Sequence, residues 1–156
     1  MDIQNPKQVI LVSCRCYGKD NLVTLSWHSP VSFKPELYAI MLSKKRFSYK
    51  MIQDSRHFVV NFMPYDMKKE ALFCGMHTGK NTDKFKELGL KKEEAEKINC
   101  PILKKCSAYM ECRLVNEVEA GDHVILVGQV LKSGIKNKKR RLFQDSGEGY
   151  RFTTTK

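Results

Sequence analysis

The chain has 156 residues, of which 42% are hydrophobic and 29% are charged, and it carries a formal net charge of +11 at pH 7. This length predicts a single domain over residues 1–156, and the composition is typical of a soluble globular protein with a core of its own. Because no apolar run approaches the ~20 residues of a membrane-spanning helix and no secretory signal pattern opens the chain, we expect a cytoplasmic protein without a membrane partner. The excess of Lys and Arg favours an anionic partner, such as a nucleotide phosphate, a nucleic acid or an acidic protein.

The first half of the chain reads as strands joined by short turns. Residues 8–16 are rich in Val, Ile and Leu and predict a strand, and a turn at 17–20 leads into a returning strand over 21–27. Two further strands are expected over 37–42 and 57–63, the second of which ends at a proline.

Helices are expected between and after these strands. Each begins at a residue whose side chain is suited to capping: Ser48 for a helix to residue 54, Asp66 for one to about residue 75, and Thr82 for one to residue 88. A short fourth helix is expected over 93–98, ahead of Pro101.

The last third of the chain returns to strands. Residues 107–118 alternate between apolar and polar side chains, and a Gly-Asp turn joins them to a strand over 123–132. Hairpins at both ends with helices between them favour an antiparallel barrel with helical insertions over a parallel sheet, so the fold class is mainly β. A basic, irregular tail is expected over 133–156, and its dense run at 136–141 is typical of a solvated connection.

The six cysteines do not indicate a disulfide framework or a metal site. Cys14, Cys74 and Cys112 lie in apolar stretches of a chain without an export signal, where thiols normally stay reduced. Cys14 with Cys16, and Cys74 with His77, each offer two ligands, but no second pair follows at the spacing of zinc modules. We therefore expect free thiols and no metal.

The stretch from Asn21 to Ser32 carries more hydroxyl groups than a core strand needs and is too apolar for a loop. Such a strand suits a ligand that is flat and apolar at one end and forms hydrogen bonds at the other. An ordinary hairpin edge is the alternative.

Two helix starts are candidates for holding an anion. Lys44, Lys45 and Arg46 precede the helix expected at Ser48, and the start of a helix already carries about half a positive charge, so an anion among these cations would be favourable. Residues 79–83 repeat the arrangement with a glycine, a lysine and a threonine. Each segment also has an ordinary alternative. The cations of the first segment could extend into solvent, and the second segment could be a capped helix without a ligand.

Catalytic patterns are otherwise sparse. The four histidines, His28, His57, His77 and His123, are interpreted as structural or surface residues, with His28 at the proline turn the best candidate for a general base. A domain without acid–base machinery but with a cofactor-shaped site fits redox chemistry, in which the cofactor supplies the reactivity. The hydroxyl-rich strand and the two anion sites together point to flavin mononucleotide (FMN).

An ordered series of segments is shared with a known family. The segments are residues 21–27, 34–37, 46–49 with Ile52, 58–61, the long block 73–85, 111–114, and 121–123 with 127–128. On these residues the chain resembles the flavin reductase-like, FMN-binding split-barrel family, and most closely its flavoredoxin and prokaryotic ferric reductase branch. The likeness covers about residues 8–132, and residues 141–143 and 149–152 resemble the closing segment of that family.

The resemblance implies a six-stranded antiparallel split barrel that forms a homodimer, with FMN near the dimer interface. It implies that the ring and ribityl chain lie along Thr24, Leu25, Ser26, Trp27, His28, Ser29, Val31 and Ser32. It further implies that Ser43, Arg46, Phe47 and Ser48 approach the ribityl and phosphate groups, and that Lys80, Asp83 and Lys84 complete the polar rim. Asn61 is expected to be a structural hydrogen-bonding residue, and Trp27 either packs near the ring or lies in the core.

The function implied is that of an FMN-binding oxidoreductase. Electrons would pass from NAD(P)H or another reduced carrier through the flavin to a ferric complex, a free flavin or a protein, and because the flavin carries the chemistry no catalytic residue is assigned. A flavin-binding module without reductase activity is one alternative. A small basic nucleic-acid-binding barrel is the less favoured alternative. Such proteins stack bases on aromatic side chains in a basic groove, and the aromatic residues of this chain are not organised in that way.

Overall fold

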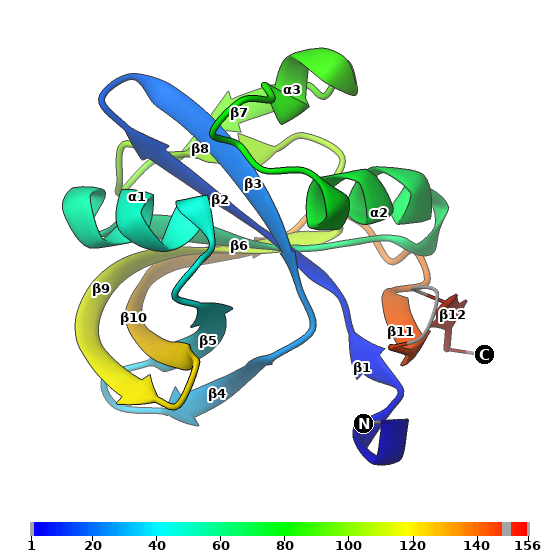
Figure 1. Cartoon of the computed structure of the whole chain (residues 1–156), viewed down its shortest axis with the longest axis horizontal. Coiled ribbons are helices and arrows are strands. Elements are labelled where there is room, and N and C mark those ends of the chain that lie inside the picture. The colour runs from blue at the N-terminus through cyan, green and yellow to red at the C-terminus, as the bar shows by residue number, and fades with distance from the viewer. Residues whose placement is uncertain (1, 148–150, 156) are drawn as a thin grey trace.

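The computed structural model describes residues 2–147 and 151–155 and shows a curled, seven-stranded antiparallel sheet (Figure 1). The strand order is β3-β2-β6-β9-β10-β5-β4. The strands are β2 (Ile10–Cys16), β3 (Lys19–Leu25), β4 (His28–Ser32), β5 (Leu37–Ser43), β6 (His57–Phe62), β9 (Ala108–Ala120) and β10 (His123–Ile135). The expected antiparallel barrel with helical insertions is confirmed, but it has seven strands instead of six, because residues that follow the expected hairpin form β4.

The two edge strands of this sheet are consecutive in the chain. β3 pairs with β2 and β4 pairs with β5, while Ser26 and Trp27 connect β3 to β4. The chain therefore crosses from one edge of the sheet to the other in two residues, and the barrel is split at this crossing.

The alternation of side chains along β2 produces two cores. Ile10, Val12 and Cys14 belong to a buried cluster with residues of β5, β6, β9 and β10, whereas Val9 and Leu11 belong to a second cluster. Helix α1 (Phe47–Ser55) contributes Met51 and Ile52 to the first cluster. Helix α2 (Lys68–Met76) and helix α3 (Lys84–Glu87) contribute to the second. β2 is thus buried on both faces, which explains its continuous apolar sequence.

The helix starts differ from those expected. Arg46 is the N-cap of α1, and the Ser48 hydroxyl accepts a hydrogen bond from Asn21 Nδ2 (2.8 Å). α2 follows a 3-10 helix, η2 (Tyr65–Met67), which contains Asp66. α3 is capped by Asp83, whose carboxylate accepts from the Lys86 amide, and not by Thr82. The expected capping residues were therefore wrong: the Ser48 hydroxyl is used in a tertiary hydrogen bond, η2 precedes α2, and Asp83 takes the capping position one residue after Thr82.

The helix expected over 93–98 is also wrong. Residues of this segment form β7 (Lys92–Glu94), which pairs with β8 (Pro101–Leu103). Glu94 in β7 bonds Arg15 of β2, so a contact between distant segments overrides the local helical tendency.

The C-terminal tail is built into the fold. β1 (Lys7–Gln8), β11 (Leu142–Ser146) and β12 (Arg151–Thr154) form a three-stranded sheet, and a short 3-10 helix, η1 (Asp2–Gln4), precedes β1. In the run at 136–141, Lys136 pairs with Glu93 (2.9 Å) and Lys139 with Asp66 (2.8 Å). This basic run is therefore attached to the barrel through ion pairs.

Several side-chain expectations can be checked directly. All six cysteines lie within the described residues and have free thiols, five of them buried. Asn61 is buried, donates to the Leu11 carbonyl (2.9 Å) and accepts from the Leu103 amide (2.9 Å), which confirms its structural role. In the described part of the chain, no group of three or more His, Cys, Asp or Glu side chains is placed to hold a metal, and no helix is long and apolar enough to cross a membrane.

Candidate functional site

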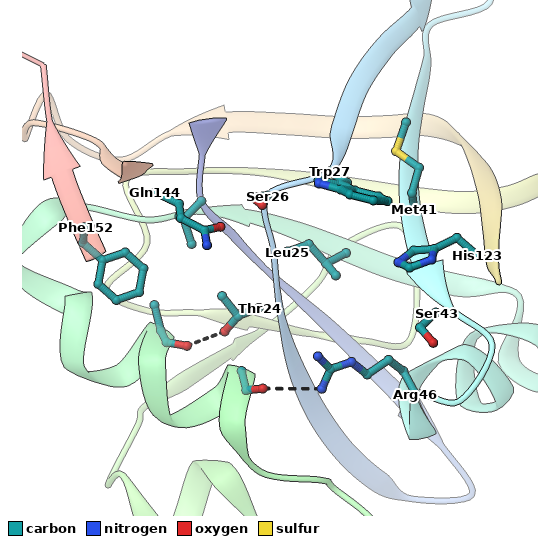
Figure 2. A pocket seen from close by; sticks show the side chains of 13 residues that line it. Thr24, Leu25, Ser26, Trp27, Met41, Ser43, Arg46, His123, Gln144 and Phe152 are labelled. Carbon is teal, nitrogen blue, oxygen red and sulfur yellow. Dashed lines mark hydrogen bonds between the residues drawn. The ribbon is translucent and has the colours of Figure 1, made fainter. Parts of the chain in front are cut away.

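A cavity of about 330 Å³ lies at the split in the barrel (Figure 2). Its walls come from β3 and the β3–β4 connection, from β5, β10 and α2, and from both ends of the chain. The lining residues are Val9, Thr24, Leu25, Ser26, Trp27, Met41, Ser43, Arg46, Ala71, Gly75, His123, Gln144 and Phe152. We call this the ring cavity, and its volume is at the lower end of the range of about 300–1,000 Å³ for small-molecule sites.

The edge strand β3 supplies one wall with backbone polar groups. Among the described strands β3 pairs with β2 alone, so the outward N–H and C=O groups near Thr24 and Leu25 have no strand opposite them. The Thr24 hydroxyl donates to the Ala71 carbonyl (2.5 Å) and fixes α2 beside this edge. The wall can therefore form hydrogen bonds with the polar edge of a flat ligand.

Trp27 and His123 form an aromatic wall. Their ring centroids are 4.8 Å apart, and the Trp27 side chain is 41% exposed, so it lies at the cavity and not in the core. His123 Nδ1 donates to Asp122 Oδ1 (2.7 Å), and this bond lowers the pKa of the Asp122 carboxyl. Among the described residues, Nε2 has no hydrogen-bond partner. This wall offers apolar surface together with one polar ring atom.

A smaller cavity of about 110 Å³ adjoins the first at Arg46, and we call it the basic cavity. Its lining residues are Asn21, Val23, Lys45, Arg46, Phe47, Ser48, His77, Thr78, Gly79 and Lys84. No carboxylate of the described residues lines either cavity. The N-terminus of α1 also lies here, which adds the positive end of the helix dipole.

Lys84 places a buried cation against the basic cavity. It is 2% exposed, and its ammonium donates to the carbonyls of Leu22 (2.5 Å) and Cys74 (2.9 Å). Burial lowers the pKa of Lys84, and within residues 2–147 and 151–155 no carboxylate pairs with it. A buried charge without a counter-ion is unfavourable, so an anion in the adjoining cavity would stabilise it.

The Asn21 side chain and Gly79 shape the floor of the basic cavity. Asn21 Oδ1 is buried and lacks a hydrogen-bond partner in the described part of the chain. A Cβ at position 79 would lie 2.2 Å from that oxygen, so only glycine allows the loop to approach this closely.

The donor set of the basic cavity fits a phosphate group. Arg46 and Lys45 supply charge, Ser48 supplies a hydroxyl, and the start of α1 supplies backbone amides. A phosphate ester held there would direct the rest of its molecule into the ring cavity, because Arg46 lines both.

The residues expected from the sequence are distributed over several places. The ring cavity contains Thr24, Leu25, Ser26, Trp27, Ser43 and Arg46, and the basic cavity contains Arg46, Phe47, Ser48 and Lys84. The structure therefore brings together nine of the fifteen expected residues.

The other six lie outside both cavities. His28 lines a groove of about 610 Å³ beyond Trp27, and Val31 and Ser32 line one of about 270 Å³ along β4, next to Ser29. Asp83 caps α3 and lines a separate cavity of about 300 Å³, while Lys80 is exposed. His28, Ser29, Val31 and Ser32 lie outside the cavities because they follow the crossing at Ser26 and Trp27 and belong to β4, at the opposite edge of the sheet.

Several lining residues were not expected from the sequence. For the ring cavity they are Val9, Met41, Ala71, Gly75, His123, Gln144 and Phe152. The Gly-Asp-His segment at 121–123 was a usable signal for His123. The likeness of residues 149–152 to the closing segment of the family was a usable signal for Phe152. Gln144 had no local signal, because only the docking of the C-terminal sheet brings it to the cavity.

Comparison with known proteins agrees with this architecture. The flavin reductase like domain family matches residues 3–151. An uncharacterized protein of Archaeoglobus fulgidus is 31% identical over 144 residues, which cover 87% of this chain and 81% of that protein. The reductase component of the flavin-dependent trigonelline monooxygenase of Acinetobacter baylyi is 26% identical over 121 residues, or 78% of this chain, which spans 37% of that protein.

Solved structures show the same fold at low identity. The FMN-binding protein from Thermus thermophilus superposes with a TM-score of 0.90 at 22% identity and covers 99% of this chain and 89% of that one. The flavoredoxin of Desulfovibrio vulgaris gives a TM-score of 0.89 at 18% identity and covers 97% of this chain and 87% of that one. Because the family model matches nearly the whole of this chain, the chain belongs to the flavin reductase-like family.

Proposed function

We propose that this chain is an FMN-binding oxidoreductase that passes electrons from NAD(P)H, or from another reduced carrier, to a ferric complex, a free flavin or a protein. The observation that carries the proposal is the pair of cavities that share Arg46 as a lining residue. One has aromatic and backbone walls, and the other is basic and, in the described residues, free of carboxylates.

Each part of the site has a separate role in holding the cofactor. Arg46, Lys45, Ser48 and the start of α1 would bind the phosphate, with Lys84 adding buried positive charge. The outward edge of β3 would bind the polar side of the ring, and Trp27 with Met41 would contact its apolar side. FMN in this position supplies reversible electron transfer, which no side chain of the site provides.

The electrostatics of the site favour an electron-rich ligand. Arg46 lines the ring cavity, and the His123 ring faces it from β10. Positive and hydrogen-bond-donating groups fixed around a cavity stabilise negative charge that develops there. Relatives described as reductase components of flavin-dependent monooxygenases, and solved flavoredoxins, support this assignment.

We also propose that the protein is a homodimer. Trp27, Val31 and Phe33 are exposed large apolar side chains on or beside the free edge strand β4. An apolar groove runs along the same strand. Such a patch beside a ligand site is typical of a surface that a second protein chain covers.

Titration with FMN tests the binding site. We expect Arg46→Ala to weaken FMN binding about 10- to 100-fold, because a charge-assisted hydrogen bond to phosphate contributes about 1.5–3 kcal/mol. Riboflavin, which has no phosphate, should lose clearly less affinity than FMN in the Arg46 variant, because only its contact with the ring cavity is affected. Arg140→Ala is the matched control, since Arg140 is exposed and lines neither cavity. Equal FMN affinity of the Arg46 variant and the native protein would exclude the assigned phosphate site.

Anaerobic mixing of the FMN-loaded protein with NADH and with NADPH tests the activity. We expect bleaching of the blue absorbance band with at least one of them. A protein that binds FMN but keeps its oxidised spectrum with both nucleotides and with dithionite-reduced carriers would be a flavin-binding module without reductase activity.

A further inference from the structure

The basic connection between β10 and β11 is fixed to the barrel by hydrogen bonds at both of its ends. The Lys136 amide donates to the Ser107 carbonyl (2.8 Å), and the Arg140 carbonyl accepts from the Tyr65 amide (2.8 Å). Between them, Asn137 Oδ1 accepts from the Ser107 hydroxyl (2.9 Å). The charged side chains of this connection therefore project from a backbone whose position is set by the fold.

These hydrogen bonds bring together cations from three separate segments of the chain. Residues 104–105 lie just before Ser107, and residues 68–69 follow η2, which contains Tyr65. Figure 1 shows the connection, in orange, beside the start of α2. We call the exposed cations of the three segments the basic strip, and its members are Lys68, Lys69, Lys104, Lys105, Lys138 and Arg140.

The members of the basic strip have no carboxylate partners among the described residues. The other lysines of the connection do: Lys136 pairs with Glu93 and Lys139 pairs with Asp66. Within residues 2–147 and 151–155, no ion pair includes a member of the strip. A concentration of uncompensated positive charge attracts a negatively charged partner and orients it during the encounter.

The basic strip borders the ring cavity. β11 follows Arg140 and Arg141, and its residue Gln144 lines that cavity. At about 3.3 Å per residue of extended chain, the backbone positions of Arg140 and Gln144 are at most about 13 Å apart. Figure 1 shows β4, which carries the proposed dimer surface, on the opposite side of the view. A partner on the strip would therefore come close to the proposed flavin without covering the β4 edge.

The surroundings of the strip favour a protein partner over a nucleic acid. Sites for single-stranded nucleic acid stack bases on aromatic rings that lie open in a basic groove. The two tyrosine rings next to the strip are instead covered by lysines, Tyr65 by Lys68 (4.9 Å) and Tyr109 by Lys136 (5.8 Å). Transient contacts between electron-transfer proteins are small and depend on charge, which a strip of this kind can supply.

We propose that the basic strip is the docking surface for an acidic electron-carrier protein that supplies electrons to the flavin. The inference rests on the proposed function and gives the chemical class of its reduced carrier. Two carrier molecules that each lose one electron would reduce one flavin, and solvent would supply the accompanying proton.

The test measures binding of two acidic carriers, a plant-type [2Fe–2S] ferredoxin and a flavodoxin, by isothermal titration calorimetry at low ionic strength. The strip variant is Lys138→Gln with Arg140→Gln. The control is Lys50→Gln with Lys86→Gln, which removes the same charge from exposed lysines of α1 and α3. We expect the strip variant to bind the preferred carrier at least about fivefold more weakly than the native protein, and the control to stay within about twofold of it. Added salt should weaken native binding, because it screens exposed charges.

Three results would overturn the inference. The first is a native protein that binds neither carrier, and the second is equal loss of affinity in the strip variant and the control. The third is a single-stranded oligonucleotide that binds the native protein more tightly than either carrier and loses affinity in the strip variant, which would assign the strip to nucleic acid. All variants should bind FMN like the native protein, since none of the changed residues lines either cavity. A native protein that binds no FMN would contradict the proposed function, whereas the carrier titrations test the strip separately.

Discussion

Lys84 is a buried and His28 a half-buried ionisable side chain, and the protein accommodates them in different ways. Lys84 stays among carbonyl oxygens beside the basic cavity, where an anion would complete its environment. His28 has both ring nitrogens engaged: Nε2 donates to the Gln8 carbonyl (2.7 Å) and Nδ1 accepts from the Tyr38 hydroxyl (2.7 Å). His28 therefore has the structural role that the sequence favoured for the histidines, and its engaged ring nitrogens do not suit a general base.

The pH dependence of stability follows from the environment of His28. Burial lowers the pKa of His28, although the bond to Gln8 opposes this, so below pH 6.5 the unfolded chain binds more protons than the folded one. The free energy of unfolding should therefore fall as the pH drops from 7.5 through 6.5 to 5.5.

Urea denaturation of His28→Gln tests this. The variant should lose about 1–3 kcal/mol of unfolding free energy at pH 7.5, because the Tyr38 and Gln8 partners are left unpaired, and its stability should depend less steeply on pH. His77→Gln, which changes an exposed ring, serves as the control and should keep the native slope. If the unfolding free energy of the His28 variant depended on pH as steeply as that of the native protein, a group other than His28 would be responsible for the pH dependence.

At the scale of elements, the two glycines of β10 have different surroundings. Gly128 lies next to a register shift in β10, and a Cβ there would come within 2.6 Å of Phe58 Cζ and 2.8 Å of Cys112 Cβ. A Cβ at Gly134 would instead meet the outer atoms of the Tyr109 ring, at 2.7 Å. Phe58 and Cys112 are fully buried in the barrel core, whereas Tyr109 is half-buried. The side chains around Gly128 therefore have less room to move away from an added methyl group than the Tyr109 ring beside Gly134.

We expect Gly128→Ala to lower the free energy of unfolding by about 1–3 kcal/mol, because the core around Phe58 is already filled. Gly134→Ala should have a clearly smaller effect, since the Tyr109 ring can turn toward solvent. Urea denaturation monitored by circular dichroism measures both. Equal losses in the two variants would mean that the core at Phe58 relaxes as readily as the surface at Tyr109.

At the scale of the whole molecule, the split barrel leaves its two edges differently covered. The β3 edge faces the ring cavity, while the β4 edge carries the exposed apolar residues Val31 (54% exposed) and Phe33 (100% exposed) just beyond it. This arrangement places the proposed dimer surface next to Trp27, so assembly and cofactor binding would share a border.

Sedimentation velocity tests the dimer. The native protein should sediment as a species of twice 18.1 kDa, and Phe33→Glu should shift it toward the monomer, because a charge in an apolar interface is strongly unfavourable. Ile135→Glu is the control, since Ile135 is also exposed but lies at the end of β10. A monomeric native protein, or a dimer that tolerates Phe33→Glu, would argue against this surface.

Local sequence patterns determined much of this protein. The apolar runs and alternating side chains predicted the main strands, and the capping residue expected at Ser48 located the start of α1 to within two residues. These features depend on residues close together in the chain, whose periodicity and charge carry the information.

The tertiary structure alone decided which segments share the site. That Gln144 and Phe152 meet Thr24, that Lys84 points inward while Lys80 does not, and that β4 belongs to the far edge all depend on strand register and the curl of the sheet. The contacts at the site join residues more than 50 positions apart, and the place of β4 depends on a crossing of two residues. The packing of the two cores sets this geometry, and no local pattern specifies that packing.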